Sequence, residues 1–99
     1  MSWRARLNGL KDTIAYVMAY APDRFPYRDY LPPGGQMNLD CIFEQVRTEF
    51  LDGVKGCGNT SEIDECRRGI EYSYQSYRNG DMKNGFLKIQ EVLHILRGL

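Results

Sequence analysis

The sequence has few of the side chains that catalytic and metal sites need. Among its 99 residues are one histidine, His94, and three cysteines, Cys41, Cys57 and Cys66. Structural zinc sites take paired ligands about two to four residues apart, and the sequence has no such pair. His94 falls on the side of its predicted helix opposite the apolar stripe, away from any nucleophile that it could activate. We therefore expect no enzyme, no metal and no cofactor.

A net charge and a long apolar run are also lacking. Thirteen basic and 13 acidic side chains give a formal net charge of zero, so no overall field draws the chain to nucleic acid or to an anionic membrane. No run of about 18 apolar residues is present to span a bilayer. The stretch after Arg4 and Arg6 is interrupted by polar residues, unlike a secretory signal. The sequence predicts a cytoplasmic protein without nucleic-acid or membrane partners.

The odd number of cysteines argues against a disulfide framework. Without an export signal, a reducing compartment is expected, where thiols stay free. We therefore expect three free thiols, with a bond between Cys57 and Cys66 as the alternative.

What the sequence does have is apolar residues at helical spacing in four segments. The predicted helices cover residues 2–21, 38–53, 61–78 and 81–97 of a single domain, 1–99. Residues suited to begin or end them are Ser2, Pro22, Asn38, Thr60 or Ser61, Asn79–Gly80 and Asp81. The four stripes are Trp3, Leu7, Leu10, Ile14, Val17, Met18 and Ala21; Leu39, Ile42, Phe43, Val46, Phe50 and Gly53; Ile63, Cys66, Ile70, Tyr74 and Tyr77; and Met82, Phe86, Ile89, Val92, Leu93 and Leu96. The expected fold is an all-α, four-helix bundle-like domain whose last two helices form an antiparallel hairpin.

The connection between the first two helices is long and rich in proline and aromatic residues. Residues 22–36 hold all four prolines, the Gly34–Gly35 pair, and Phe25, Tyr27 and Tyr30. Extended, this segment reaches about 45 Å, whereas a 20-residue helix is about 30 Å long. The first two helices are therefore either parallel or antiparallel. We expect the connection to cover Leu87 and Ile95, which project away from the stripe of the last helix.

Charge is unevenly distributed along the chain. Residues 36–65 contain two basic and seven acidic side chains, a local charge of −5. One interpretation is a solvated surface that nearby Arg and Lys partly neutralise, and the other is a docking surface for a basic partner. We expect the acidic side chains to lie near one end of the domain. They are Asp40, Glu44, Glu49, Asp52, Glu62, Asp64 and Glu65.

Seven tyrosines are many for a chain of this length, and tyrosine is favoured at protein interfaces. Tyr74 and Tyr77 fall on a core stripe and are expected to be structural. Tyr27, Tyr30 and Tyr72 fall outside the stripes and are expected to contact a partner.

These observations favour a non-enzymatic protein-binding module. Its most concrete form is a bacterial immunity or inhibitor protein that occludes a basic partner, such as a nuclease toxin, through an acidic helical surface. The alternative is a structural or adaptor subunit, including a homodimer that buries Leu87, His94 and Ile95. A small metal-binding protein or enzyme is the third interpretation.

Overall fold

The four apolar stripes form four α-helices. The structure is a computed structural model that describes residues 3–21, 23–55 and 60–98, with side chains from residue 7 onward. The helices are α1 (Trp3–Tyr20), α2 (Leu39–Gly53), α3 (Ser61–Arg78) and α4 (Met82–Arg97), and a short 3₁₀ helix, η1, covers Pro33–Gly35. The described ranges contain no strand. The predicted all-α fold is confirmed, whereas the roles of Ser2 and Pro22 lie outside the described residues.

Side chains cap three of the helices as their residue types predict. The side chains of Asn38, Thr60 and Asp81 accept hydrogen bonds from backbone N–H groups three residues later, at 2.8, 3.2 and 3.3 Å. At the end of α3, Gly80 has a φ of +83°, a left-handed conformation that favours glycine. The Asp81 N–H there donates to the Ser76 carbonyl at 2.8 Å. The chain therefore reverses within a few residues and enters α4.

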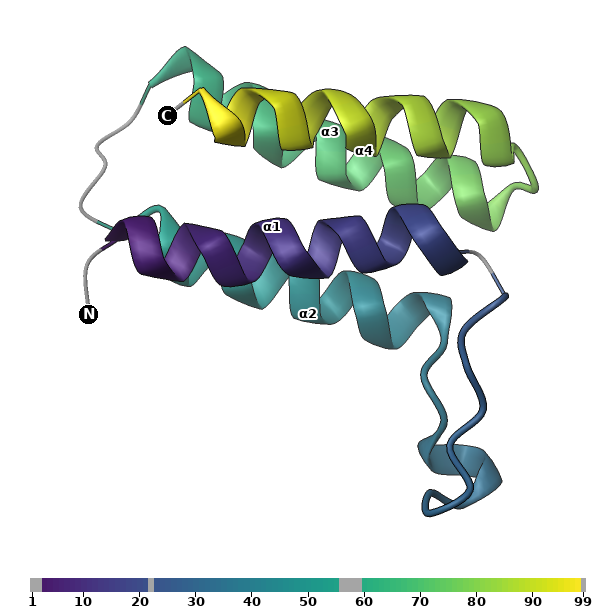
Figure 1. The fold of residues 1–99 in the computed structure, drawn as a ribbon. Helices are drawn as coiled ribbons and strands as arrows, with labels where there is room; N and C mark the ends of the chain where they lie inside the picture. The colour runs from purple at the N-terminus through teal and green to yellow at the C-terminus, as the bar shows by residue number, and fades with distance from the viewer. Residues whose placement is uncertain (1–2, 22, 56–59, 99) are drawn as a thin grey trace.

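The helices run alternately up and down around one core (Figure 1). α1 packs against α2 and α4, and α3 packs against α2 and α4. α1 and α2 are thus antiparallel, which decides between the two directions that the sequence allows. The core consists of the buried apolar residues Leu7, Leu10, Ile14, Val17, Ala21, Ile42, Phe43, Val46, Phe50, Ile63, Cys66, Ile70, Tyr77, Ile89, Val92, Leu93 and Leu96.

α3 and α4 approach each other closely at two glycines. A Cβ at Gly69 would lie 2.6 Å from Cγ2 of Val92, and a Cβ at Gly85 would lie 2.8 Å from Cδ2 of Tyr77. Between these points the buried Ser73 hydroxyl donates to the Gly85 carbonyl at 2.7 Å. At both points the backbone of one helix therefore packs directly against a side chain of the other. A residue larger than glycine at either position would not permit this register.

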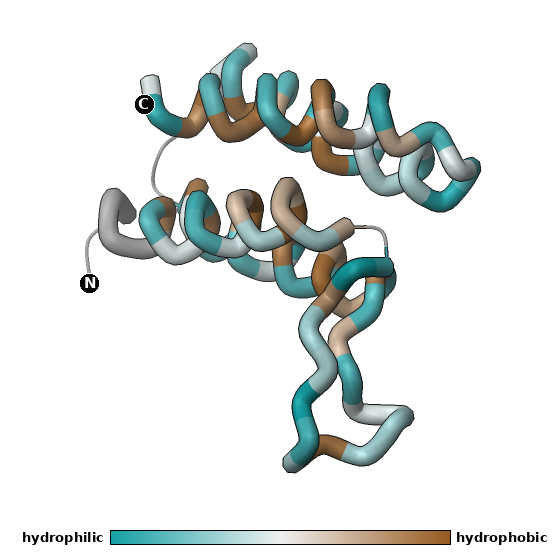
Figure 2. The backbone as a smooth tube through the Cα atoms, turned by 45° about the vertical axis from the view of Figure 1, so that its right-hand side comes forward, coloured by the Kyte–Doolittle hydropathy of each residue, from teal (hydrophilic) through white to brown (hydrophobic). Residues whose placement is uncertain are grey.

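The long connection projects from the bundle as an arm, which we define as residues 23–38 (Figures 1 and 2). Only its base packs against the helices, where the Phe25 ring stacks on Tyr16 with centroids 5.8 Å apart. The expectation that this connection covers α4 is wrong, because the arm leaves from the α1–α2 hairpin and points away from α4. Leu87 stays 45% exposed, whereas Ile95 is partly buried against the core without help from the arm.

The assignment of Met82 and Phe86 to the core is also wrong. They are 44% and 37% exposed. Both lie in the first half of α4, beside the end of α1. The last residues of α1 line a groove next to them and leave them partly exposed. Together with Leu87 they form an exposed apolar surface.

Replacing Gly85 with alanine should lower the free energy of unfolding by about 1–3 kcal/mol, because the added methyl group meets the Tyr77 ring. Gly9→Ala is the matched control, since no atom lies within 4 Å of a Cβ at this exposed helical position. It should stabilise the protein by about 0.5–1 kcal/mol through helix propensity. Urea unfolding of both variants checks this, and equal effects at the two positions would contradict the close approach.

Candidate protein-interaction site

The arm is organised by one side chain, that of Gln36. Its Oε1 accepts a hydrogen bond from the Arg28 N–H at 2.8 Å, and its Nε2 donates to the carbonyls of Arg28 and Leu31 at 2.8 and 2.9 Å. These bonds join the two limbs of the arm across its tip. Tyr27 directly precedes the segment that Gln36 closes, and Tyr30 lies within it. The two rings are 66% and 80% exposed. The arm therefore holds two aromatic rings in solvent on a hydrogen-bonded backbone.

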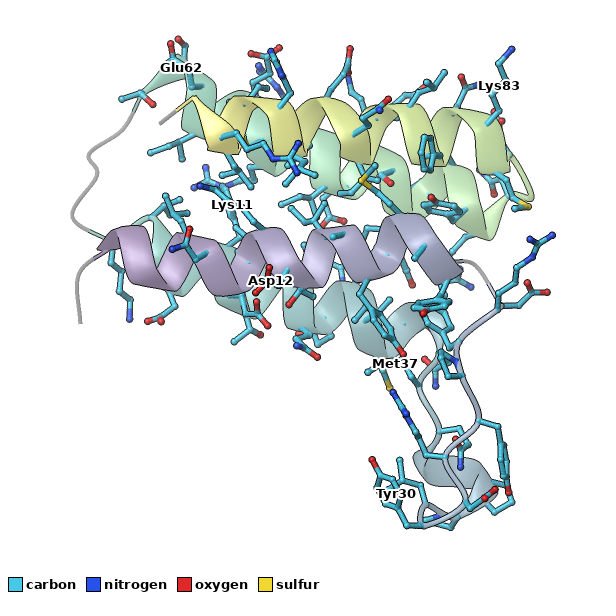
Figure 3. The ribbon with its side chains drawn as sticks, viewed as in Figure 1. Lys11, Asp12, Tyr30, Met37, Glu62 and Lys83 are labelled. Carbon is cyan, nitrogen blue, oxygen red and sulfur yellow. The ribbon has the colours of Figure 1, made fainter. Side chains whose placement is uncertain are left out.

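A shallow groove lies between α1 and α2 above the base of the arm. Its volume is about 250 Å³. The labelled side chains of Asp12 and Met37 project on the side of the α1–α2 hairpin from which the arm extends, and Tyr30 lies at the far end of the arm (Figure 3). We call the groove, the adjoining Glu49 and the two exposed tyrosines of the arm the corner. The groove is lined by Asp12, Thr13, Tyr16, Met37, Ile42 and Gln45.

Glu49 is the most firmly positioned carboxylate of the corner. The Thr13 hydroxyl lies 2.8 and 2.9 Å from its two oxygens, and Gln45 Nε2 donates to Oε1 at 2.7 Å. The side chain is half-buried. No Lys or Arg among the residues that the structure describes forms an ion pair with Glu49 or with the nearby, exposed Asp12. The corner therefore carries negative charge that is fixed in place and available to a basic group.

Several other predicted acidic residues already have partners within the chain. Asp64 pairs with Arg67 at 3.2 Å, and Asp52 pairs with Lys55 at 3.8 Å. The Asp40 carboxylate accepts the hydrogen bond of the Tyr74 hydroxyl. These contacts are on the surface, where each contributes little to stability, but the two ion pairs neutralise part of the acidic segment.

Arg47 neutralises a further part of it by joining α2 to α3. Its guanidinium contacts Glu71 at 2.6 Å and Glu44 at 3.3 Å. The hydrogen bond with Glu71, with a smaller contribution from Glu44, raises the pKa of Arg47. Arg47 of the same helix therefore partly neutralises the exposed Glu44 carboxylate.

The structure does not bring the seven acidic side chains together. Because α2 and α3 are antiparallel, Asp40 and Glu44 lie at the end of the bundle from which the arm extends, and the first turn of α3 lies at the opposite end (Figure 1). That opposite end carries Glu62, Asp64 and Glu65, and the end of α2 adds Asp52. Two separate acidic regions result, and Glu49 lies between them on α2, beside Thr13 of the groove.

Tyr72 is 54% exposed, as its position predicts, but it lies in the other layer of the bundle. Its ring is 5.5 Å from Nζ of Lys88 on α4. It therefore does not belong to the corner. Of the aromatic residues expected in the core, Tyr77 is buried, whereas Tyr74 lies at the edge, where its hydroxyl reaches Asp40 and Arg78.

Sequence reasoning did not identify Asp12, Tyr16, Gln36 or Met37. Asp12 and Tyr16 belong to the face of α1 opposite its core stripe, which only the antiparallel placement of α2 makes part of a groove. Gln36 follows the Gly34–Gly35 pair, and nothing local predicts that its amide bonds backwards across the arm.

Cys41 and Cys66 are free thiols, exposed and buried respectively, which confirms the prediction for these two. Cys57 lies outside the described residues. Burial, with smaller contributions from Glu65 and Glu62, raises the pKa of Cys66 from 9.0 to about 11. Within the described ranges, no group of three potential metal ligands converges, and no helix has the length and apolar character to cross a membrane.

Comparisons with protein-family models, with curated proteins and with solved structures found no match to this chain.

Gln36→Ala should loosen the arm without unfolding the bundle, because it removes three hydrogen bonds that connect only arm residues. Trypsin should then cleave after Arg28 several-fold faster than in the wild type, while the melting temperature stays within about 2 °C. Gln75→Ala, at an exposed position on α3, is the control. An unchanged cleavage rate would show that the Gln36 bridge does not order the arm.

Cys66→Ala should reduce the pH dependence of stability in alkaline solution. The folded state raises the pKa of the thiol, so this contribution is complete below pH 9 and is lost as pH rises towards 11. The loss amounts to at most about 2–3 kcal/mol. Cys66→Ala should lower stability at neutral pH by leaving a small void, but its stability should fall less than that of the wild type between pH 9 and 11. Identical slopes in urea unfolding would contradict the buried thiol.

Proposed function

We propose that this chain is a non-enzymatic protein-binding domain that holds a basic segment of a partner protein in the corner. The observation that carries the proposal is the presentation of Tyr27 and Tyr30 in solvent on an arm that Gln36 holds in shape. An arm without a binding role would have little reason to keep two large rings away from the core beside it.

The physical advantage of such an arm is low entropic cost on binding. Tyrosine offers a large apolar ring with few rotatable bonds, and its hydroxyl remains satisfied at a wet interface. Because the backbone between the two rings is already hydrogen bonded, a partner orders few additional dihedral angles. Tyr27 and Tyr30 are thus suited to be the anchors of an interface.

The charge of the corner supports a basic partner. The Glu49 carboxylate is held by Thr13 and Gln45, which orient it without neutralising it. A Lys or Arg side chain entering the groove would gain a charge-assisted hydrogen bond with a preorganised acceptor. Tyr16 and Met37 line the same groove and can contact the aliphatic part of such a side chain.

In its most concrete form, the proposal describes an inhibitor, such as a bacterial immunity protein, that occludes the basic active-site surface of a nuclease. Carboxylates replace phosphates in that role, and steering by opposite charge speeds the encounter. The acidic region of Glu62, Asp64 and Glu65 at the opposite end of the bundle would then lie outside this contact. A structural or adaptor subunit is the second candidate, which the exposed surface of α4 favours.

The proposal is tested by affinity capture from the source cells with three variants as bait. Tyr27→Ala with Tyr30→Ala and Glu49→Gln with Asp12→Asn each change the corner, whereas Glu62→Gln with Asp64→Asn changes the opposite acidic region. We expect a basic protein bound by the wild type, with affinity reduced about 10- to 100-fold by each corner variant. The third variant should bind within about threefold of the wild type, and added salt should weaken all complexes.

Retention of the same partner by both corner variants would refute the assignment of the corner. Loss of binding only in the Glu62 and Asp64 variant would move the interface to the other end of the bundle. Circular dichroism of each variant ensures that a loss of binding is not a loss of fold.

A further inference from the structure

The outward face of α4 combines exposed apolar side chains with a distinctive order of charges. Leu87 lies at its centre, with Phe86 and Met82 towards α1. No segment of the described chain covers this face (Figure 1). A groove of about 340 Å³ runs beside it, between α4 and the end of α1, and its apolar lining includes Met18 and Ala21.

Polar residues flank Leu87 at equal distances along the helix on its two sides, and the two charged ones have opposite sign. Lys83 lies four residues before Leu87 and Glu91 four residues after it, each about one helical turn away. Asn84 and Gln90 lie three residues before and after. Rotation of the helix by 180° about an axis through Leu87 therefore exchanges a cation with an anion and an amide with an amide.

We propose that α4 is the interface of a symmetric homodimer, in which two α4 helices pack antiparallel with Leu87 on the two-fold axis. In this arrangement Leu87 contacts its own copy. Lys83 of each protomer faces Glu91 of the other, so the axis generates two reciprocal ion pairs. Asn84 faces Gln90 of the other protomer, where amide side chains can donate and accept.

Phe86, beside Leu87 on α4, adds an aromatic contact to this interface. Phe86 lies towards α1, whereas Lys88 lies towards α3, where its Nζ is 5.5 Å from the Tyr72 ring. The two-fold axis is perpendicular to both α4 helices and places the α1 side of one protomer against the α1 side of the other. Phe86 therefore approaches Phe86 of the other protomer, and both exposed rings lose contact with water.

The remaining charges near α4 are compatible with this packing. Glu91 forms an ion pair with Lys88 at 3.1 Å within its own helix, and its carboxylate retains acceptor sites for Lys83 of the other protomer. Arg24 adds a cation at the Lys83 end of the groove. At the other end a second groove, of about 630 Å³, is lined by Glu65, Glu91, His94 and Arg97 among others. An occupant of uniform charge would therefore meet a like charge at one end, whereas in the antiparallel dimer Lys83 of each copy meets Glu91 of the other.

A single helix pair with flanking aromatics buries less than the roughly 800 Å² per partner of a standard interface. The dimer should accordingly be weak, with a dissociation constant between about 1 μM and about 1 mM. Dimerisation through α4 leaves the arms free, because they extend from the other layer of the bundle (Figure 1). Each dimer would thus carry two copies of the corner.

Sedimentation velocity over a series of protein concentrations tests the proposal. The wild type should pass from monomer to dimer as its concentration rises. Lys83→Glu places two acidic side chains opposite each other at both symmetry-related positions, and Glu91→Lys places two lysines there. Each variant alone should associate at least about 10-fold more weakly than the wild type.

The two variants mixed in equal amounts should form a heterodimer of near wild-type affinity. In the mixed dimer, each acidic side chain of the Lys83→Glu protomer faces a lysine of the Glu91→Lys protomer. Asp12→Lys changes the charge by the same amount as Glu91→Lys but lies on the other layer, so it should dimerise like the wild type. Asp12→Lys should also weaken binding of the basic partner. The variant therefore distinguishes a failure of the α4 dimer from a failure of the proposed partner binding.

A wild type that stays monomeric up to about 1 mM would overturn the proposal, as would a mixture that associates no better than its components. Leu87→Ser provides a second test, because this exposed position contributes little to the fold of the monomer. A Leu87→Ser dimer as strong as the wild type would overturn the assignment of α4 even if the protein is dimeric.

Discussion

The close approach of α3 and α4 is the constraint on which the other features of this structure depend. Gly69 and Gly85 bring the two helices to a separation at which a methyl group would collide with Val92 or Tyr77. The buried hydrogen bond from Ser73 to the Gly85 carbonyl then fixes how far one helix can slide along the other. A buried hydroxyl without this acceptor would be costly, so the register is specified as well as stabilised. With α4 fixed on α3, Leu87 has only one direction in which to point, which is outward.

The other pair of helices is joined by different means. α1 and α2 share an apolar contact, and the Thr13 hydroxyl adds a hydrogen bond to Glu49 across it. Contacts between α2 and α3 include Arg47 with Glu71 and Tyr74 with Asp40, both near the surface. Such surface contacts select the orientation of the two hairpins more than they stabilise the fold. The carboxylates that orient the helices already accept hydrogen bonds within the chain, so they are less available to a partner.

Local patterns were sufficient to predict the helices, and they failed where the outcome depends on how the helices assemble. Asn38, Thr60, Gly80 and Asp81 act within one turn of their own positions, so their roles follow from residue type and spacing. The exposure of Phe86 does not follow in this way. It belongs to the stripe of α4 by spacing, yet whether that part of the stripe is covered depends on where α1 ends relative to α4.

The candidate site was predictable in kind but not in place. The sequence identifies an acidic segment and exposed tyrosines, and both exist, but the antiparallel order of α2 and α3 divides the acidic residues between two ends. Glu49 becomes important only because Thr13, 36 positions earlier, lies beside it. Gln36 acts through backbone groups of the opposite limb of the arm, a contact that no periodicity encodes. Long-range pairing, rather than composition, is what the sequence alone left undetermined.

A net charge of zero has a different meaning once these positions are known. The protein is not indifferent to charge, because Glu49 and Asp12 place negative charge beside the groove between α1 and α2, and Lys83 and Glu91 place opposite charges at equal distances from Leu87. The charge of Glu49 and Asp12 favours a partner of opposite sign. The order of Lys83 and Glu91 along α4 instead complements a second copy of the same helix in antiparallel orientation. Screening at physiological salt limits both effects to contacts within about 8 Å. The discrimination therefore depends on side chains that are already held in position, as Glu49 is by Thr13 and as Glu91 is by Lys88.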